Sequence, residues 1–279
     1  MKKAILLVLS FVFMFLKGSS QNDSISENKK VYKLKPAIDV PIIAIGTLWS
    51  VFAFTKIYNK THPTIDQINR LNKDDINAFD RWAIYPYSKS LDKISYYPFY
   101  ASIPLPLILF MTRKEMRSDF LQLTLLYWEA MSITGLIGTN ATYNVDRYRP
   151  YAYSSETPME KRTGRIAKNS FYAGHVQVVA TPTFFMAKVY ADYYPDSKIK
   201  WVFYGIASLA TGTTAYMRLR GGEHFPTDIL LGTAAGALAG ILVPHYHKVH
   251  SEKKSTMSIL PYVSGEINGL VFTYKFKKN

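Results

Sequence analysis

Two histidines and two arginines in this chain have the side chains that an attack on a phosphate ester needs. His224 lies six residues after Arg218, and both His175 and Arg149 lie upstream. One imidazole can attack phosphorus, a second can protonate the leaving group, and guanidinium groups can hold the phosphoryl oxygens. This inventory is typical of an enzyme.

The segment after Arg218 predicts how one of these imidazoles is held. Pro226 suits the first turn of a helix, which puts Asp228 within about one turn of His224. A carboxylate there can hold the proton of one ring nitrogen and leave the lone pair of the other free for attack. We expect Arg218 at the end of the preceding helix, pointing into the same pocket.

The order of these residues resembles the pattern of a known family. The type 2 phosphatidic acid phosphatases, which share a fold with the vanadium haloperoxidases, carry Lys-x6-Arg-Pro, then Pro-Ser-Gly-His, then Ser-Arg-x5-His-x3-Asp. The matching residues of this chain, in order, are Arg149-Pro150, Ala173-Gly174-His175 and Arg218-x5-His224-x3-Asp228.

The resemblance implies a role for each matched residue. His224 would be the nucleophile that forms a phosphohistidine, Asp228 its partner, and His175 the general acid. Such a reaction requires no metal ion and no other cofactor. The implied phosphate ligands are Arg149, Arg218 and the backbone N–H of Gly174.

Four positions depart from the family pattern. The lysine falls on Thr142, the Pro-Ser pair on Tyr172-Ala173, and the serine of the third motif on Met217. Each lost charge-assisted hydrogen bond would weaken phosphate binding by about 1.5–3 kcal/mol. Nearby basic residues that could restore the charge are Arg147, Lys168 and Arg220.

Two other functions fit the same residues. A vanadate-dependent haloperoxidase would use His224 to bind vanadate, but that group carries a fuller set of cations, and the lysine is missing at Thr142. A catalytically degenerate membrane or scaffold protein is favoured by the changes at Thr142, Ala173 and Met217.

The remaining histidines are interpreted as non-catalytic, and we predict no metal site. The C-terminal histidine run lacks acidic or cysteine partners at metal-binding spacing, and the chain contains no cysteine at all. These histidines are His62, His245, His247 and His250.

Composition favours a membrane partner. The 279 residues are 48% hydrophobic and 15% aromatic, with a formal net charge of +14. The basic residues lie between apolar segments and form no contiguous stripe with stacking aromatics, so an anionic membrane is a better partner than nucleic acid. Together with the resemblance to the phosphatase family, membrane association implies a lipid phosphate or diphosphate as the substrate class.

The chain divides into four parts by composition. Residues 1–20 have two lysines, an apolar run and small residues, as a signal peptide does. Residues 21–36 form a polar arm, 37–250 a helical domain and 251–279 a tail. Alternating aromatic residues in the tail predict a short β-hairpin, either capping the bundle or aiding outer-membrane association.

The helical domain is predicted to be an all-α, membrane-embedded six-helix bundle that gathers the three motifs at one end. Glu129 interrupts the third apolar stretch and is expected either to pair with a polar neighbour in the bundle interior or to handle substrate. Residues 72–82 are predicted to form one amphipathic surface helix, and small residues spaced four apart over 232–240 permit close helix packing. The six apolar stretches are 37–55, 96–112, 119–140, 175–192, 199–217 and 226–244.

Two orientation signals disagree. The basic loop 113–117 should be cytoplasmic, which places the motifs outside, whereas a cleaved signal followed by six spans places them inside. We expect the active site on the outer side of the membrane. The protein would then lie in the inner membrane of a bacterial cell envelope, with the motifs facing the periplasm. A periplasmic or outer-membrane-associated bundle is the alternative.

Overall fold

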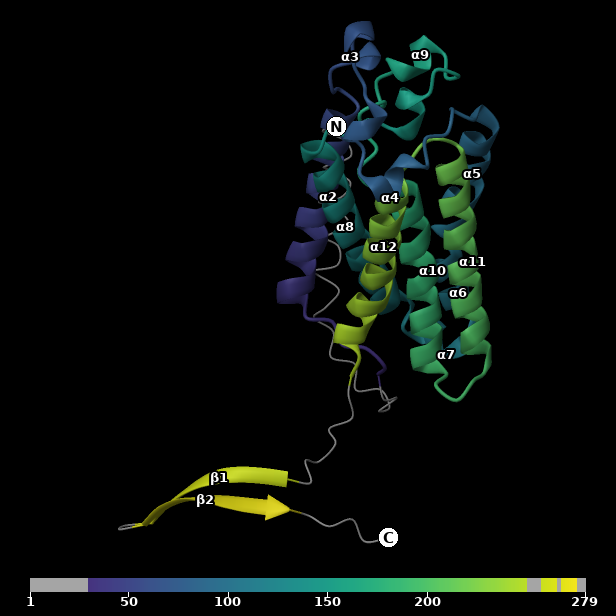
Figure 1. Ribbon diagram of the computed structural model, residues 1–279. Helices are drawn as coiled ribbons and strands as arrows, with labels where there is room; N and C mark the ends of the chain where they lie inside the picture. The colour runs from purple at the N-terminus through teal and green to yellow at the C-terminus, as the bar shows by residue number, and fades with distance from the viewer. Residues whose placement is uncertain (1–29, 250–256, 265–266, 275–279) are drawn as a thin grey trace.

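The computed structural model describes residues 30–249, 257–264 and 267–274, and these are mostly helical. The long helices run side by side in one bundle (Figure 1). The predicted signal peptide and residues 21–29 of the polar arm lie outside the described residues. The long helices are α2 (Pro36–Ile57), α5 (Lys89–Ser102), α6 (Leu105–Thr112), α8 (Phe120–Asn144), α10 (Gly174–Tyr193), α11 (Ile199–Arg220) and α12 (Pro226–His247).

The predicted count of six helices is not confirmed, because the described chain has more helical segments. The second apolar stretch is divided into α5 and α6 near Pro104, which caps α6. Short helices also form in the connections between the long ones. They are α3 (Ile65–Asn69), α4 (Ala78–Arg81), α7 (Lys114–Ser118) and α9 (Met159–Arg162), with the 3-10 turns η1 (Lys73–Asp75) and η2 (Pro150–Tyr153).

The prediction of one amphipathic helix over residues 72–82 is wrong. This segment forms η1 and α4, separated at Asn77, whose side chain caps α4 by accepting a 3.0 Å hydrogen bond from the backbone N–H of Asp80. Asparagine competes with the helical backbone in this way, so it ends one turn and starts another. The break also buries the Asp80 side chain.

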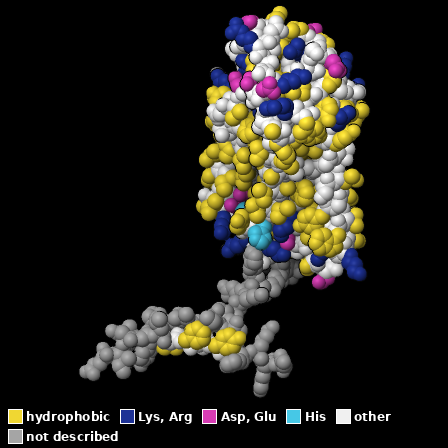
Figure 2. Space-filling view, in the orientation of Figure 1, with side chains coloured by type: hydrophobic (Ala, Val, Ile, Leu, Met, Phe, Trp, Pro, Cys, Tyr) yellow, Lys and Arg dark blue, Asp and Glu magenta, His cyan; other side chains and the backbone are white. Residues whose placement is uncertain are grey.

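The surface of the bundle suits a membrane. Within the described residues, four helical segments are long and apolar enough to cross one: Pro36–Ile57, Lys89–Thr112, Phe120–Asn144 and Pro226–His247. Large apolar side chains are exposed along their outer faces and along α11. Figure 2 shows hydrophobic side chains covering the middle of the visible face, with charged side chains gathered towards the ends.

Helix α10 lies at the centre, in contact with α5, α8, α11 and α12. Glycines on α12 allow a very close approach to it: a Cβ on Gly236 would lie 2.5 Å from the carbonyl oxygen of Gln177. The small-residue spacing in the sequence predicted this packing. A Cβ on Gly232 would lie similarly close to the carbonyl oxygen of Ala173, and one on Gly240 to that of Thr181.

Strands β1 (Met257–Ser264) and β2 (Ile267–Tyr274) pair antiparallel, Met257 opposite Tyr274 and Ser264 opposite Ile267. The two residues between the strands lie outside the described part, so the turn of the hairpin stays a prediction.

We expect Gly236→Ala to destabilise the bundle by about 1–3 kcal/mol, because the added methyl group overpacks the contact between α12 and α10. Gly205→Ala in α11 is the matched control, since no atom lies within 4 Å of its Cβ position. That change should be neutral or stabilising by up to about 1 kcal/mol. Unfolding in detergent measures both, and equal midpoints would contradict the packing argument.

Candidate active site

The three motifs meet at one end of the bundle, where α10 and α12 begin and α11 ends (Figure 1). The loop before α10 is fastened by backbone hydrogen bonds. The N–H of Arg149 donates to the carbonyl of Ala167 at 2.8 Å, and that of Ser170 donates to the carbonyl of Arg147 at 3.0 Å. The N–H of Ala173 donates to the carbonyl of Asp228 at 3.1 Å, which joins the first turns of α10 and α12.

His224 is held with one ring nitrogen free. Its Nδ1 lies 2.7 Å from the backbone carbonyl oxygen of Ser170. A carbonyl only accepts hydrogen bonds, so Nδ1 carries the proton and the lone pair of Nε2 remains available. Burial, together with the positive charges of Arg149 and Arg218, holds the pKa of His224 well below its ordinary value. The imidazole is therefore neutral and nucleophilic at neutral pH.

Asp228 does not bind His224 directly, contrary to the expectation from spacing. Its carboxylate accepts hydrogen bonds from the Ser170 hydroxyl at 2.6 Å and from the backbone N–H of Phe225 at 3.0 Å. As the third residue of α12, Asp228 closes back on the exposed amide at the helix start. It reaches His224 through Ser170, whose hydroxyl binds Asp228 and whose carbonyl binds the imidazole.

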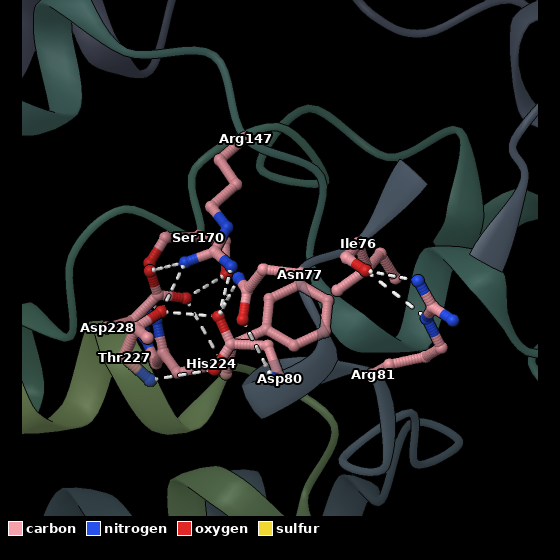
Figure 3. Close-up of polar contacts among 10 residues, drawn as sticks. Ile76, Asn77, Asp80, Arg81, Arg147, Ser170, His224, Thr227 and Asp228 are labelled. Atoms are coloured by element: carbon pink, nitrogen blue, oxygen red, sulfur yellow. Dashed lines mark hydrogen bonds and ion pairs between the residues drawn. The ribbon is translucent and has the colours of Figure 1, made fainter. Parts of the chain in front are cut away.

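Arg147 holds Asp228 in place through an ion pair and links it to Asp80. Figure 3 shows its guanidinium between two buried carboxylates, 2.6 Å from Asp80 and 2.5 Å from Asp228. It also donates to the hydroxyl of Thr227 at 2.9 Å. Arg147 therefore holds Asp80 and Asp228 together, and a role for it in phosphate binding stays a prediction.

The other two basic residues suggested by the sequence also have partners elsewhere. Lys168 lies over the ring of Tyr148 at 5.8 Å, and Arg220 lies over the ring of Tyr85 at 4.2 Å. These cation–π contacts occupy both side chains. That either residue binds phosphate stays a prediction.

Arg149 and Arg218 do come together, on a carboxylate that the sequence analysis missed. Glu223 is fully buried and forms ion pairs with both guanidinium groups, at 3.0 Å from Nη2 of Arg218. Arg218 also donates to Asp92 at 2.6 Å and to Ser95 at 3.2 Å. The Nε atoms of Arg149 and Arg218 are buried without a hydrogen-bond partner.

Lys161 supplies a third cation. Its Nζ lies 3.7 Å from Glu223 and 3.6 Å from the centroid of the Tyr87 ring. Burial and the positive charges of Arg149 and Arg218 lower the pKa of Lys161 to about 8. Thr142, which stands where the family has lysine, instead returns its hydroxyl to the carbonyl of Gly138. The positive charge that the family has at the position of Thr142 is thus supplied here by Lys161.

His175 and Gly174 complete the site at the start of α10. The ring centroids of Tyr96 and Phe99 lie 4.6 and 4.9 Å from the centroid of the His175 ring. Nε2 of His175 is buried without a hydrogen-bond partner. Gly174 is the first residue of the helix, and no atom lies within 4 Å of its Cβ position. An open helix N-terminus with free N–H groups binds anions.

Comparison with known proteins gives one match. The family model described as the PAP2 superfamily matches residues 123–252, which include all three motifs. This match assigns residues 123–252 of the chain to the PAP2 superfamily. No curated protein and no solved structure matches the chain. PAP2 members are phosphatases, so the family supports hydrolysis of a phosphoric ester.

Several residues of this PAP2 site carried little sequence signal. Ser170 acts largely through its carbonyl, which any residue has, and Asp92 lies far upstream of the motifs. Lys161 follows no family motif and resembles an ordinary loop lysine. Glu223 was visible beside His224, but a single acid next to a glycine pair is more often solvated.

We expect Lys161 to control the alkaline side of the pH profile. The wild-type kcat/KM should fall as pH rises through about 8, because the free enzyme then loses the Lys161 charge. Lys161→Arg should move this fall to higher pH, since arginine stays charged. Lys161→Met should raise KM by about tenfold or more.

Lys168→Met is the control, because it removes a lysine of the same loop that lies outside the cation cluster. Steady-state kinetics at a series of pH values give kcat/KM and KM for the wild type and all three variants. An unchanged alkaline limb in Lys161→Arg, or equal KM values for the two methionine variants, would contradict the role of Lys161.

Proposed function

We propose that this protein hydrolyses a lipid phosphate or diphosphate, without a metal ion, through a phosphohistidine on His224. The observation that carries the proposal is the fixed imidazole: Ser170 holds Nδ1, and Nε2 is free beside two arginines. A neutral, oriented imidazole in a cationic pocket has the properties of an activated nucleophile.

The first step is transfer of the phosphoryl group to the enzyme. Nε2 of His224 attacks phosphorus, the bond to the ester oxygen breaks, and the His175 imidazolium gives its proton to the departing oxygen. The negative charge of the bound phosphate favours that imidazolium form. Arg149, Arg218, Lys161 and the Gly174 N–H would stabilise the equatorial oxygens.

The second step restores the enzyme. Neutral His175 takes a proton from water, the resulting hydroxide attacks phosphorus, and the bond from phosphorus to Nε2 of His224 breaks. Phosphate leaves, and the proton of His175 passes to solvent, because burial and the charges of Arg218 and Arg149 hold the pKa of His175 well below its ordinary value in the empty site. His175 takes up a proton again when the next phosphate binds. Asp228 is assigned a positioning role, because its contact with His224 runs through Ser170.

Glu223 is proposed to hold the cations together before substrate binds. Three cations without a counter-ion would be costly to bury, and this carboxylate pairs with all of them. An incoming phosphate brings the same charge and can replace Glu223 on the guanidinium groups.

A lipid substrate is supported by the surroundings of the site. The catalytic end continues into a bundle with exposed apolar faces, and Tyr96 and Phe99 line the approach to His175. A membrane lipid could therefore keep its chains beside the helices while its phosphate enters the cation cluster. Lys161 also weakens the case for a degenerate scaffold, since it replaces the charge missing at Thr142.

The site is proposed to face the periplasm from the inner membrane of a bacterial cell envelope. The opposite end carries Lys33 and the short basic connection 113–117, which the positive-inside rule places in the cytoplasm. This orientation follows the charge rule rather than the prediction of a cleaved signal.

The purified protein should release phosphate from a panel of lipid phosphates and diphosphates in the presence of a chelator, and His224→Ala should abolish the release. His175→Ala should slow alkyl phosphates by about 100-fold or more, but nitrophenyl phosphate much less, because a good leaving group needs no acid. Equal losses on both substrates would remove His175 from the acid role.

Orientation can be tested with single cysteines, since the chain has none of its own. Ser155→Cys lies at the catalytic end and Ser118→Cys at the other, and both serines are exposed. In right-side-out vesicles a membrane-impermeant maleimide should label the first and spare the second until lysis. The reverse pattern would place the site in the cytoplasm.

A further inference from the structure

A second cluster of ionisable side chains lies at the end of the bundle opposite the catalytic site. Asp39 of α2, Glu129 of α8 and His247 of α12 bring their ligand atoms within 4.8 Å of one another. Asp39 and Glu129 are 4% and 3% exposed. His224 and His247 lie at the two ends of α12, about 30 Å apart along a helix of that length. The cluster is therefore separate from the catalytic chemistry.

The histidine is oriented as a metal ligand is. Nδ1 of His247 lies 2.8 Å from the backbone carbonyl oxygen of Val243, so Nδ1 carries a proton. Nε2 points at the carboxylates, 3.2 Å from Oδ1 of Asp39 and 3.5 Å from Oε2 of Glu129. A hydrogen bond from one ring nitrogen to a carbonyl fixes the tautomer in which the other nitrogen binds a metal.

The cluster has a deficit of positive charge. No lysine or arginine within residues 30–249 forms an ion pair with Asp39 or Glu129, whereas Asp192, also at this end, binds both Lys188 and Lys248. Oε2 of Glu129 is buried without any hydrogen-bond partner. Even with an imidazolium, two carboxylates leave a net negative charge in a buried place, which is unfavourable unless a cation compensates it.

The spacing fits a small divalent ion. Zinc binds nitrogen and carboxylate oxygen at about 2.0–2.1 Å, so ligand atoms in a tetrahedron stand about 3.3 Å apart. The distances from His247 Nε2, 3.2 and 3.5 Å, bracket that value. One imidazole and two carboxylates form a donor set that zinc accepts, with the fourth position left for water.

We propose that Asp39, Glu129 and His247 form a zinc-class metal site that ties together α2, α8 and α12. The sequence analysis found no acidic partners for the histidine run, because folding supplies them from distant helices: Asp39 is 208 positions from His247. The bound ion would stabilise the bundle and take no part in phosphate hydrolysis.

The test uses the full-length protein, purified without a histidine tag, stripped with a chelator, loaded with zinc chloride and desalted. Mass spectrometry of the metal content should find one zinc per chain, and loading should raise the melting temperature. Glu129→Gln should weaken zinc binding by more than about 100-fold, beyond the roughly 10–100-fold of an outer-shell change. His245→Ala, which removes an exposed histidine of the same run, should retain the zinc.

Cobalt in the unmodified protein provides a second readout that requires no variant to fold. Cobalt chloride should give the visible absorption of a four-coordinate ion, and zinc should abolish it. Absence of stoichiometric zinc together with absence of this spectrum would overturn the site and leave an ion pair of His247 with two carboxylates. Loss of zinc in His245→Ala with retention in Glu129→Gln would also overturn it, as adventitious binding to the histidine run.

Discussion

Three cations, two of them buried arginines, converge on one buried carboxylate, and the catalytic end of the protein depends on this interaction. Glu223 pairs with Arg149, Arg218 and Lys161, which arrive from three different segments. Without it, the like charges would repel one another at low dielectric. Burial, together with the charges of Arg149 and Arg218, lowers the pKa of His224, so the two arginines both prepare an anion site and help to keep the nucleophile neutral.

The helix packing determines where this cluster lies. Glycines on α12 let it approach the backbone of α10, which places the first turns of both helices side by side. One first turn holds Gly174 and His175, and the other holds Asp228, which caps its own helix and positions Ser170. The apolar faces that remain exposed around this packed centre are those expected to meet lipid.

The sequence predicted which motif residues meet at the catalytic end, but it missed the contacts that orient His224. The motif order predicted the superfamily and the meeting of His175, His224, Arg149 and Arg218 at one end. It could not predict the Ser170 carbonyl contact, because a backbone group has no sequence identity. Spacing alone suggested a direct bond from Asp228 to His224, but the exposed amides of a helix start compete for that carboxylate.

Charge compensation was also hard to predict from linear distance. Arg147, Lys168 and Arg220 are close to the motifs along the chain, yet each binds a carboxylate or an aromatic ring elsewhere. Lys161 takes part because α9 folds over the site. Likewise the acids around His247 lie in other helices, so no local pattern could show them.

The central claim is that His224 carries the phosphoryl group during turnover. In His175→Asn the second step lacks its base, so nitrophenyl phosphate should leave a phosphoryl group on the enzyme after an alkaline quench. Peptide mapping by mass spectrometry should place that group on His224. Turnover by wild-type protein with no phosphoryl group trapped in the variant, or a phosphoryl group on another residue, would contradict the account.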